Sequence, residues 1–550
     1  MIEPTTNLPP EDITVPPPPT AVSEDSGLVR ATAILAVGNV ASRILGLGRE
    51  IVKSNLFGTS DLLGAYTVAS LIPTTLFNLI IGGEMVSSSL VPVFSDYADP
   101  EKRKELWGLV STFLSLAAAV LAVIVILVEL FTSQVAWLIG AHEFEDPTLL
   151  PITINLMRLA TPAVLFMSVA SILTGLLFAL KRFTLPAFTG AIFNGTIVVV
   201  VLLRPERIDS LVWGLLAGSF LQIILQLPAL RDGRFRLQFN WRHPAIRRII
   251  YLYTPIVAGL VVNQAANWIS YRLAITTGDN SVTYMGYATT LYQFPLGLVV
   301  TALSMATLPT LSRLSTAYQT ALTDKNGLAG QRLQEYKETL ASGIRLAATL
   351  ILPATAGLFA LAAPIVALLF EHGQFLPQDT AITTRVLRLY LIGLPFAALD
   401  QMLVFASYAR KDTWRPALVG VISIVIYTIT AVLLLRPLGL LSLMVADSVK
   451  HIVHTLMMMG LLQQQLGGLR GHHISRSLIK ALAAALLTGL GAYGLLLLTA
   501  PLLPGTGFIA RLFHVALPGT AGLVVFVAAV FLLNIQEARN LWQPPIRWKS

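Results

Sequence analysis

The sequence predicts an all-α polytopic membrane protein with about fourteen transmembrane helices, arranged as two homologous six-helix lobes plus two extra C-terminal helices. Three observations predict this class. Of the 550 residues, 55% are hydrophobic and only 12% are charged, whereas soluble domains carry about 25% charged residues. Apolar runs of about 20 residues, the length that spans a bilayer, recur from residue 30 to residue 535. Several short motifs of the first half reappear in the second half.

The two ends of the chain have the composition of tails. Residues 1–27 are polar, acidic and rich in proline, with consecutive prolines at 16–19, and we interpret them as a disordered cytoplasmic tail. They lack the basic start and short apolar core of a cleavable signal peptide. Residues 536–550 are predicted to form a second cytoplasmic tail. The chain has no cysteine, which excludes a disulfide framework and a thiolate metal site.

Between the tails, the apolar runs divide the chain in order. Six predicted helices form an N-terminal lobe at 28–230, and a basic cytoplasmic loop at 231–247 leads to a C-terminal lobe at 248–470 with six more. Two extra helices fill 471–535. The fourteen predicted helices lie near 30–48, 62–95, 105–131, 150–180, 185–203, 209–229, 248–275, 282–310, 340–370, 383–409, 416–435, 439–462, 477–500 and 512–534.

Basic loops predict how the chain is oriented. If the N-terminus is cytoplasmic, every second loop is cytoplasmic, and these loops hold most of the Lys and Arg residues, as at 102–104, 181–182 and 410–411. The opposite loops hold acidic or neutral runs such as 143–146. Because Lys and Arg favour cytoplasmic loops, we expect both termini in the cytoplasm. The net charge of +9 then reflects orientation, and we expect no nucleic-acid partner.

Internal repeats support two homologous lobes. Ala179-x-Lys181 followed by Pro186 recurs as Ala409-x-Lys411 followed by Pro416, and Leu203-Arg204-Pro205 recurs as Leu435-Arg436-Pro437. Gly64 precedes Pro73 by nine residues, as Gly286 precedes Pro295. Six helices per lobe make the repeats parallel, related by an axis along the membrane normal. Such halves usually rock about a site at the membrane midplane to give alternating access.

Charges inside the first two apolar segments mark a candidate site. The first segment carries Arg43, Arg49 and Glu50, and the second carries Glu84 directly after Gly82-Gly83, where we expect the helix to break. A charge at the bilayer centre costs roughly 2.5–3.5 kcal/mol, so such residues usually face a bundle interior or a water-filled cavity. We therefore expect these segments to line a polar cavity.

The motifs of this region resemble a known family. Ser-Arg-Ile-Leu-Gly at 42–46, with Arg49-Glu50 and Phe57-Gly58, resembles the first-helix signature of the MurJ (MviN) lipid II flippases. These belong to the superfamily of multidrug, oligosaccharidyl-lipid and polysaccharide exporters. Residues 287–295, 364–375 and 408–416 resemble the family's eighth helix, the end of its ninth helix and its link between helices ten and eleven. The similarity covers roughly residues 28–460.

The resemblance implies a V-shaped pair of lobes around a cationic cavity. It implies that an undecaprenyl-pyrophosphate-linked sugar-peptide crosses from the inner to the outer leaflet of the cytoplasmic membrane. It also implies that the two extra helices form a groove for the lipid tail. Membrane lipids and cell-wall synthesis proteins are the other expected partners. We expect no enzymatic activity, because phosphoryl chemistry needs clustered carboxylates that hold Mg²⁺, and the acidic run 143–146 lies in a loop.

Several charges typical of the family are missing from this sequence. The family's arginine in helix two corresponds to Phe77-Asn78, its early acid in that helix corresponds to Gly64, and its Asp-Arg pair in helix eight corresponds to Thr289-Thr290. These departures leave open a different polyprenyl-linked polysaccharide unit as the cargo, or a non-transporting scaffold in cell-wall assembly. Drug export by a relative from the same superfamily is a further alternative, although it would favour a cavity rich in acids and aromatic residues.

The candidate substrate-binding residues follow from charge and position. Arg43 and Arg49 are expected to hold the pyrophosphate, because guanidinium groups bind phosphate bidentately; the alternative is that they pair with Glu50. Asn263 and Asn267, four residues apart, form a polar stripe that lines the cavity or joins helices. The candidates for substrate binding are Arg43, Arg49, Glu50, Glu84, Asn263, Asn267 and Arg272.

Three acids are candidates for a coupling-ion site: Glu84, Asp400 and Asp447. Asp447 lies three residues before Lys450, which favours a neutral pair, whereas Asp400 has no local partner in the sequence. We expect no metal and no cofactor. Na⁺, H⁺ or the membrane potential is expected to drive the cycle.

Overall fold

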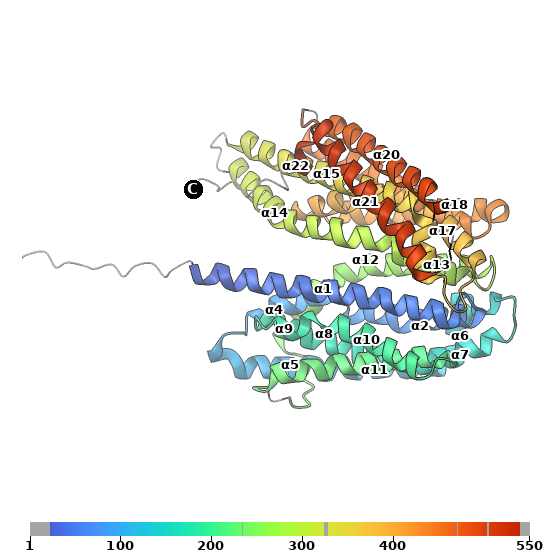
Figure 1. Ribbon diagram of the computed structural model, residues 1–550. Helices are drawn as coiled ribbons and strands as arrows, with labels where there is room; N and C mark the ends of the chain where they lie inside the picture. The colour runs from blue at the N-terminus through green and yellow to red at the C-terminus, as the bar shows by residue number, and fades with distance from the viewer. Residues whose placement is uncertain are drawn as a thin grey trace, which may run out of the picture.

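Long apolar segments fold into helices that run along one common direction (Figure 1). The computed structural model describes residues 22–233, 235–323, 328–469, 471–502, 505 and 507–539. The helices of the N-terminal lobe are α1 (Val22–Phe57), α2 (Asp61–Ile81), α3 (Gly83–Met85), α4 (Val91–Ser95), α5 (Arg103–Leu130), α6 (Thr132–Ile139), α7 (Leu149–Ala160), α8 (Ala163–Ala179), α9 (Thr184–Ala187), α10 (Thr189–Leu203) and α11 (Asp209–Gln226). Short 3₁₀ turns are η2 (Pro100–Lys102), η3 (Ala141–Glu143) and η4 (Leu227–Leu230).

The second half of the chain repeats this plan and adds a helix pair. Its helices are α12 (Pro244–Ile275), α13 (Ser281–Pro295), α14 (Thr301–Thr323), α15 (Ala329–Ala360), α16 (Ala362–Phe370), α17 (Pro377–Ala409), α18 (Trp414–Leu438) and α19 (Leu441–Leu466). The added helices are α20 (Ile474–Thr499), α21 (Phe508–Leu532) and the short α22 (Gln536–Arg539), with the 3₁₀ turn η6 (Ala500–Leu502). α20 and α21 pack together, and α20 packs along α15.

All fourteen predicted segments are helical, and the all-α polytopic class is confirmed. In the part of the chain that the structure describes, ten helices are long and apolar enough to cross a membrane, or eleven if the two parts of the bent α12 form one span. The predicted segments 185–203, 282–310 and 439–462 fall outside that set. In the first of them, α10 has only 15 residues.

Some predicted boundaries differ from the structure. α1 begins at Val22, so the end of the segment 1–27 that we predicted to be disordered is helical, while residues 1–21 lie outside the described chain. α12 begins at Pro244, before the predicted loop 231–247 ends, because proline is well suited to the first turn of a helix. α22 occupies the start of the predicted tail 536–550, and residues 540–550 are not described.

Three hydrophobic cores show how the lobes meet. One core contains residues of both lobes, from Phe57 of α1 to Phe375 and Tyr427 of the C-terminal half. A second core, between Ile81 and Tyr253, contains α12 and N-terminal lobe residues, and a third, between Leu311 and Leu469, contains only C-terminal lobe residues. Apart from α12, which packs with the N-terminal lobe in the second core, the lobes share one core at one end of the molecule and have separate cores at the other end.

We call the end with the shared core the sealed end and the opposite end the basic end. Figure 1 shows α6, α7 and α13 at the sealed end, and the start of α1 together with α4, α9, α14 and α22 at the basic end. At the basic end, Arg182 forms a bidentate ion pair with Asp232 at 2.8 and 3.0 Å. The hydrogen bonds from Arg182 hold the pKa of Asp232 below its usual range.

Two local features recur in both lobes. The second helix of each lobe contains a π-helical turn, η1 (Val86–Leu90) in the first and η5 (Leu296–Val300) in the second. Lys181 and Lys411, from the repeated Ala-x-Lys motif, have left-handed backbones with φ of 57° and 63°. Positive φ is uncommon for residues other than glycine, so its recurrence at matched positions supports an origin by duplication.

Candidate functional site

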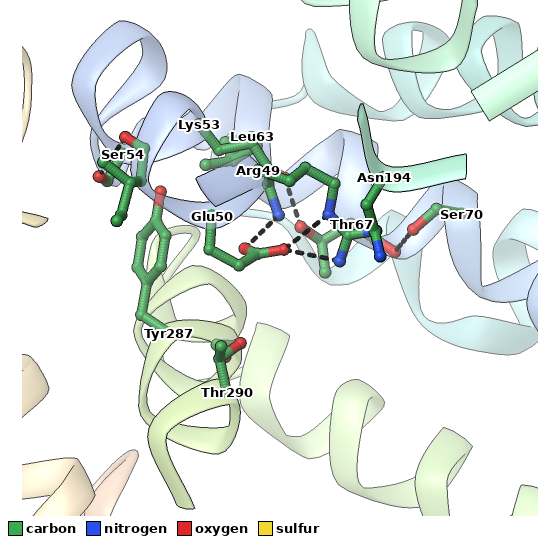
Figure 2. A network of polar contacts seen from close by, with 12 residues as sticks. Arg49, Glu50, Lys53, Ser54, Leu63, Thr67, Ser70, Asn194, Tyr287 and Thr290 are labelled. Carbon is green, nitrogen blue, oxygen red and sulfur yellow. Dashed lines mark hydrogen bonds and ion pairs between the residues drawn. The ribbon is translucent and has the colours of Figure 1, made fainter. Parts of the chain in front are cut away.

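The charges of the first helix gather into an ion-pair cluster. Glu50 is buried, with 6% of its surface exposed, and its carboxylate accepts hydrogen bonds from Arg49 at 2.8 and 3.1 Å and from Lys53 at 2.8 Å. We call Arg49, Glu50 and Lys53 the α1 charge cluster (Figure 2). One carboxylate faces two cations, so the cluster keeps one uncompensated positive charge.

The cluster is held in place by a neighbouring helix. Asn194 of α10 accepts a hydrogen bond from Arg49 at 3.0 Å and donates one to the backbone oxygen of Ser42 at 3.1 Å. Gly46 of α1 lies against Asn194, which lets the two helices approach closely. Asn194, for which the sequence suggested only a role in joining helices, is therefore also a positioning residue of the site. Its amide in an apolar segment was the available signal.

Arg43 reaches the opposite lobe. Its guanidinium lies against Gly297 of the π-helical turn η5. It occupies the space that the Cβ atom of any larger residue at position 297 would need. Its Nε is buried and has no hydrogen-bond partner among the described residues. Arg43 lies two turns before Glu50 on α1 but is not paired with it. This arginine thus presents an unused donor between the lobes and adds a second positive charge on α1.

The structure shows the surroundings of two positions at which the resemblance implies a charge and this chain has none. Thr290, which stands where the family has an arginine, lies on α13 across from Glu50 (Figure 2) and donates to the backbone of Gly286. Gly64 stands where the family has an acid, and a Cβ added there would lie 2.7 Å from the backbone oxygen of Asp279. The glycine is required by this close contact, so an acidic side chain has no space at that position.

The sealed end closes over the cluster. The Asp379 carboxylate, from the start of α17, accepts hydrogen bonds from Thr59 at 2.9 Å and from Tyr284 at 2.7 Å. Tyr287 donates to the backbone oxygen of Gly58 at 2.8 Å, and the amide of Gln374 donates to Asn55 at 3.0 Å. These bonds join the end of α1 to the C-terminal lobe at the sealed end.

Glu84 lies elsewhere, between the lobes on the basic side. Gly82 interrupts α2 with an extended backbone, and Glu84 opens the next short helix, so the predicted break is confirmed. The Glu84 side chain is exposed and lies within electrostatic range of Tyr253 of α12 and Tyr408 of α17. The structure does not bring it into contact with the α1 charge cluster.

The polar residues of α12 divide between two roles. Gln264 accepts from Thr75 of α2 at 3.3 Å, and the indole of Trp268 donates to the same hydroxyl at 3.1 Å. These residues join helices. Asn263 and Asn267 are exposed on another face of α12, the helix that contacts both α2 and α18. Both amides are thus accessible on that face, and their role in lining a cavity stays a prediction.

Arg272 lies at the sealed end. Its guanidinium donates to Glu143 at 2.8 and 3.0 Å and stands 5.9 Å from the ring centre of Trp137. Its aliphatic part packs against Gly140, whose φ is 96°. This pairing occupies Arg272 in an interhelix contact, so the structure does not group it with Arg43 and Arg49.

Asp400 and Asp447, the two coupling-ion candidates in the C-terminal lobe, both have partners. Asp400 of α17 is in direct contact with the imidazole Nδ1 of His454 on α19, although the sequence gives it no local partner. Asp447 binds Lys450 at 2.5 Å, as predicted for a neutral pair. His451 lies 3.7 Å from the same carboxylate. The spacing of 447, 450, 451 and 454 on one helical face was the sequence signal for this group.

The described arrangement suits binding of an anion between two lobes. Arg43 and the α1 charge cluster supply positive charge at the level where the shared core closes the sealed end. Toward the basic end the lobes have separate cores, and α1 is the least buried of the ten candidate spans. In the described chain no group of three or more His, Asp or Glu side chains is placed to hold a metal ion.

Comparisons with known proteins show which family this chain belongs to. A family model described as "Lipid II flippase MurJ" matches residues 53–513. The chain is 28% identical over 481 residues to a probable lipid II flippase MurJ of Bdellovibrio bacteriovorus, which covers 86% of this chain and 89% of that relative. It is 29% identical over 407 residues to the lipid II flippase MurJ of Burkholderia cenocepacia, with 72% of this chain and 76% of the relative covered.

Solved structures share the fold. A lipid II flippase MurJ in an inward closed conformation has a TM-score of 0.70 and 22% identity, covering 93% of this chain and 100% of that chain. An inward-facing multidrug resistance MATE family transporter of the MOP superfamily has a TM-score of 0.59 and 13% identity, covering 78% of this chain and 95% of that chain. Because the family model matches well over half of its residues, this chain belongs to the MurJ lipid II flippase family, a family of membrane transporters and not of enzymes.

Proposed function

We propose that this protein is a flippase that moves a lipid-linked peptidoglycan precursor, lipid II, from the inner to the outer leaflet of the cytoplasmic membrane. The observation that carries the proposal is the excess positive charge on α1, from Arg43 and the α1 charge cluster, between two lobes that share a core only at the sealed end. A pyrophosphate linked to a polyprenol is the anionic group that such a site suits.

The proposed cycle begins with the sealed end closed. If the basic end faces the cytoplasm, as the positive-inside rule predicts, the head group enters from the cytoplasmic side. The unused donor of Arg43 then binds a phosphate oxygen. Arg49 gives up part of its contact with Glu50 and binds a second phosphate oxygen. The lobes rock, the contacts of Asp379 and Tyr287 break, and the head group leaves on the outer side.

Charge movement gives the cycle a direction. An inside-negative membrane potential favours outward movement of an anion by about 2.3 kcal/mol per charge per 100 mV. Glu84, exposed between the lobes, is proposed to bind substrate or the returning cation, and the Asn263 and Asn267 amides are proposed to contact the sugar-peptide. Arg272 has a lesser proposed role, because Glu143 already occupies its guanidinium.

A second cargo is favoured by one observation. Thr290 occupies the position of a family arginine across from Glu50, and Phe77 and Asn78 occupy another. A site with fewer arginines suits a different polyprenyl-linked polysaccharide unit whose head group carries less negative charge.

Complementation tests the proposal. The resident lipid II flippase of a bacterium is depleted, and this chain is expressed as wild type or Arg43→Ala at equal membrane abundance. We expect rescue by the wild type and at least tenfold loss of viable cells with the variant. Arg207→Ala, at an exposed ion pair with Asp209, is the matched control and should rescue. A well-expressed wild type that fails to rescue would reject lipid II as the cargo.

A further inference from the structure

A group of titratable side chains lies inside the C-terminal lobe, away from the α1 charge cluster. Asp400 and His454 touch each other across α17 and α19, and their side chains are only 17% and 13% exposed. Asp447, Lys450 and His451 lie one to two turns earlier on α19. Lys450, His451 and His454 have no part in the proposed substrate site.

We propose that Asp400 and His454 form a proton-binding site, and that one proton carried by this pair is coupled to the rocking of the lobes. The role in transport rests on the proposed function, whereas the binding of the proton does not. The site goes beyond family membership, because it depends on side chains of this chain and their observed contacts.

Charge balance indicates that the group binds a single proton. Two carboxylates and one ammonium leave a net charge of −1, which one protonated imidazole neutralises. In a protein interior of low dielectric constant an uncompensated charge is costly, whereas a neutral, hydrogen-bonded set is tolerated. His454 is the imidazole in direct contact with a carboxylate that has no other cation beside it, so it is the one that holds the proton.

The ligand chemistry favours a proton over a metal cation. Hard cations take sets of oxygen ligands. Here the Asp400 carboxylate faces a ring nitrogen, and the Asp447 carboxylate is already bound to Lys450 at 2.5 Å and faces His451 at 3.7 Å. An imidazole–carboxylate pair is instead a group that exchanges a proton near neutral pH.

An unpaired hydroxyl points to a further participant. Tyr292 of α13 is 7% exposed, and its hydroxyl has no hydrogen-bond partner among the described residues. The ring centres of Tyr292 and Tyr390 are 5.6 Å apart. The charges of Asp400 and Asp447 both act on the Tyr292 hydroxyl. A buried hydroxyl without a partner is costly, and a proton or water exchanged with the pair would satisfy it.

Other titratable groups surround the pair and must be counted in its titration. They are Tyr292 from α13, Tyr390 and Tyr408 from α17, Tyr427 from α18, and Asp447, Lys450 and His451 from α19, and Glu84 of α3 acts on Tyr408 together with Asp400. The tyrosines remain neutral in the physiological range.

The pair lies where α19 packs along the part of α17 that contains Pro395. Pro395 interrupts the backbone bonding of α17. On either side of it, Ser448 donates to the oxygen of Leu389 at 2.7 Å and Thr455 donates to the oxygen of Phe396 at 2.8 Å. The Asp400–His454 contact is the next contact between α19 and α17 along the two helices. A proton on His454 makes that contact charge-assisted and stronger, so its loss weakens the attachment of α19 to α17 near Pro395.

A short path connects the group to the interface between lobes. The ammonium of Lys450 stands 5.7 Å from the ring centre of Tyr427, whose hydroxyl bonds Ser270 of α12 at 2.7 Å. α12 contacts both lobes. This chain of contacts gives a change of charge at Asp400 and His454 a route to the helix that lies between the two lobes.

The first test measures proton binding without any substrate. Infrared difference spectra of the full chain in lipid nanodiscs are recorded between about pH 5 and pH 9. Among the histidine signals we expect one carboxylate–imidazole component that is lost in both Asp400→Asn and His454→Gln, whereas signals from other histidine–carboxylate contacts, such as that of His472 with Glu338, should remain. The component should persist in Asp232→Asn, which removes the exposed ion pair at the basic end. The amide variants retain side-chain volume, and size-exclusion profiles show whether they fold.

Two outcomes of this test overturn the proposal. One is a set of spectra in which Asp400→Asn and His454→Gln remove no component that the wild type shows. The other is a spectrum that changes when sodium replaces choline at constant pH, which would make the site a sodium site.

The second test measures coupling in proteoliposomes that contain lipid II. An imposed gradient of one pH unit should change the flipping rate by up to about tenfold, the limit for one proton, and the two variants should lose this response. Flipping by the wild type without a pH response overturns the coupling. If lipid II does not flip at all while the infrared component is present, the proposed cargo is wrong and the proton site is supported.

Discussion

At the scale of single residues, Glu50 determines the electrostatic state of the site. It is the one buried carboxylate of the α1 charge cluster, and it bonds both Arg49 and Lys53. The sequence predicted Arg43, Arg49 and Glu50 as members of the site because charges in an apolar segment are costly. It did not reveal which arginine is occupied by Glu50 and which is free, because that depends on how the side chains pack between α1, α10 and η5.

Glu50→Gln should destabilise the protein. It leaves two partly buried cations without a counter-charge, which costs on the order of 3 kcal/mol for a fully buried pair and less here because Arg49 is 31% exposed. Asp209→Asn breaks the exposed pair with Arg207 and should change stability by less than about 1 kcal/mol. Denaturant unfolding in detergent measures both, and equal effects would contradict this account of the cluster.

At the scale of elements, two glycines at matched positions of the two lobes have different surroundings. Gly64 in α2 lies against the backbone of Asp279, whereas a Cβ on Gly286 in α13 meets nothing within 4 Å. The sequence predicted these glycines as a repeated feature. It did not predict their difference, because the contact of Gly64 is made by a loop more than 200 residues away in the chain.

Gly64→Ala and Gly286→Ala should therefore have opposite effects. The first forces the α12–α13 loop away from α2 and should cost about 1–3 kcal/mol, as overpacking does. The second has space and should stabilise its helix by up to about 1 kcal/mol. Thermal unfolding of the two variants in one detergent checks this, and similar shifts in Tm would show that the close contact is absent in the folded protein.

The added helix pair is attached to the C-terminal lobe at both ends. At the basic end, Arg345 of α15 binds Glu537 of α22 at 2.7 Å. At the sealed end, Arg511 of α21 binds Glu371 at 2.6 Å, next to His372. α20 and α21 therefore move with the C-terminal lobe.

The loop at 371–376 should loosen in acid. Burial and the charge of Arg511 lower the pKa of His372, so the folded loop favours the neutral imidazole. The stabilising contribution is complete above the ordinary histidine pKa of about 6.5 and declines as the pH falls below it. Hydrogen exchange of this loop, corrected for intrinsic rates, should increase from about pH 7.5 to pH 5.5. His372→Gln should remove the pH dependence, and an unchanged dependence would assign it to another group.

At the scale of the whole molecule, the lobes share a core at one end only. Hydropathy, loop charge and repeats predicted an all-α membrane protein, because these signals are local. The count of spans was less accurate, since α10 is short and α19 carries Asp447, Lys450 and two histidines. Which end is closed was not predictable, because the two states differ in contacts between lobes and not in helices.

A cross-link across the sealed end should arrest transport. The chain has no cysteine, so Asn55→Cys with Gln374→Cys introduces the only two thiols, at residues whose backbones are hydrogen-bonded at 3.0 Å. A short thiol-specific cross-linker should reduce lipid II flipping in proteoliposomes at least tenfold. A cleavable cross-linker restores flipping on reduction. Full activity with the link intact would show that the sealed end does not open during the cycle.

The three cores also impose an order on assembly. Every residue of the core between Ile81 and Tyr253 lies in the N-terminal lobe or in α12, so this core has been synthesised before α13 to α19, whereas the shared core extends from Phe57 to Ala446 and must wait for α19. During biogenesis the N-terminal lobe therefore stands for some time as a partly assembled unit. In that period Arg43 faces lipid or insertion machinery instead of Gly297, and the nascent chain must tolerate this charge until its second half arrives.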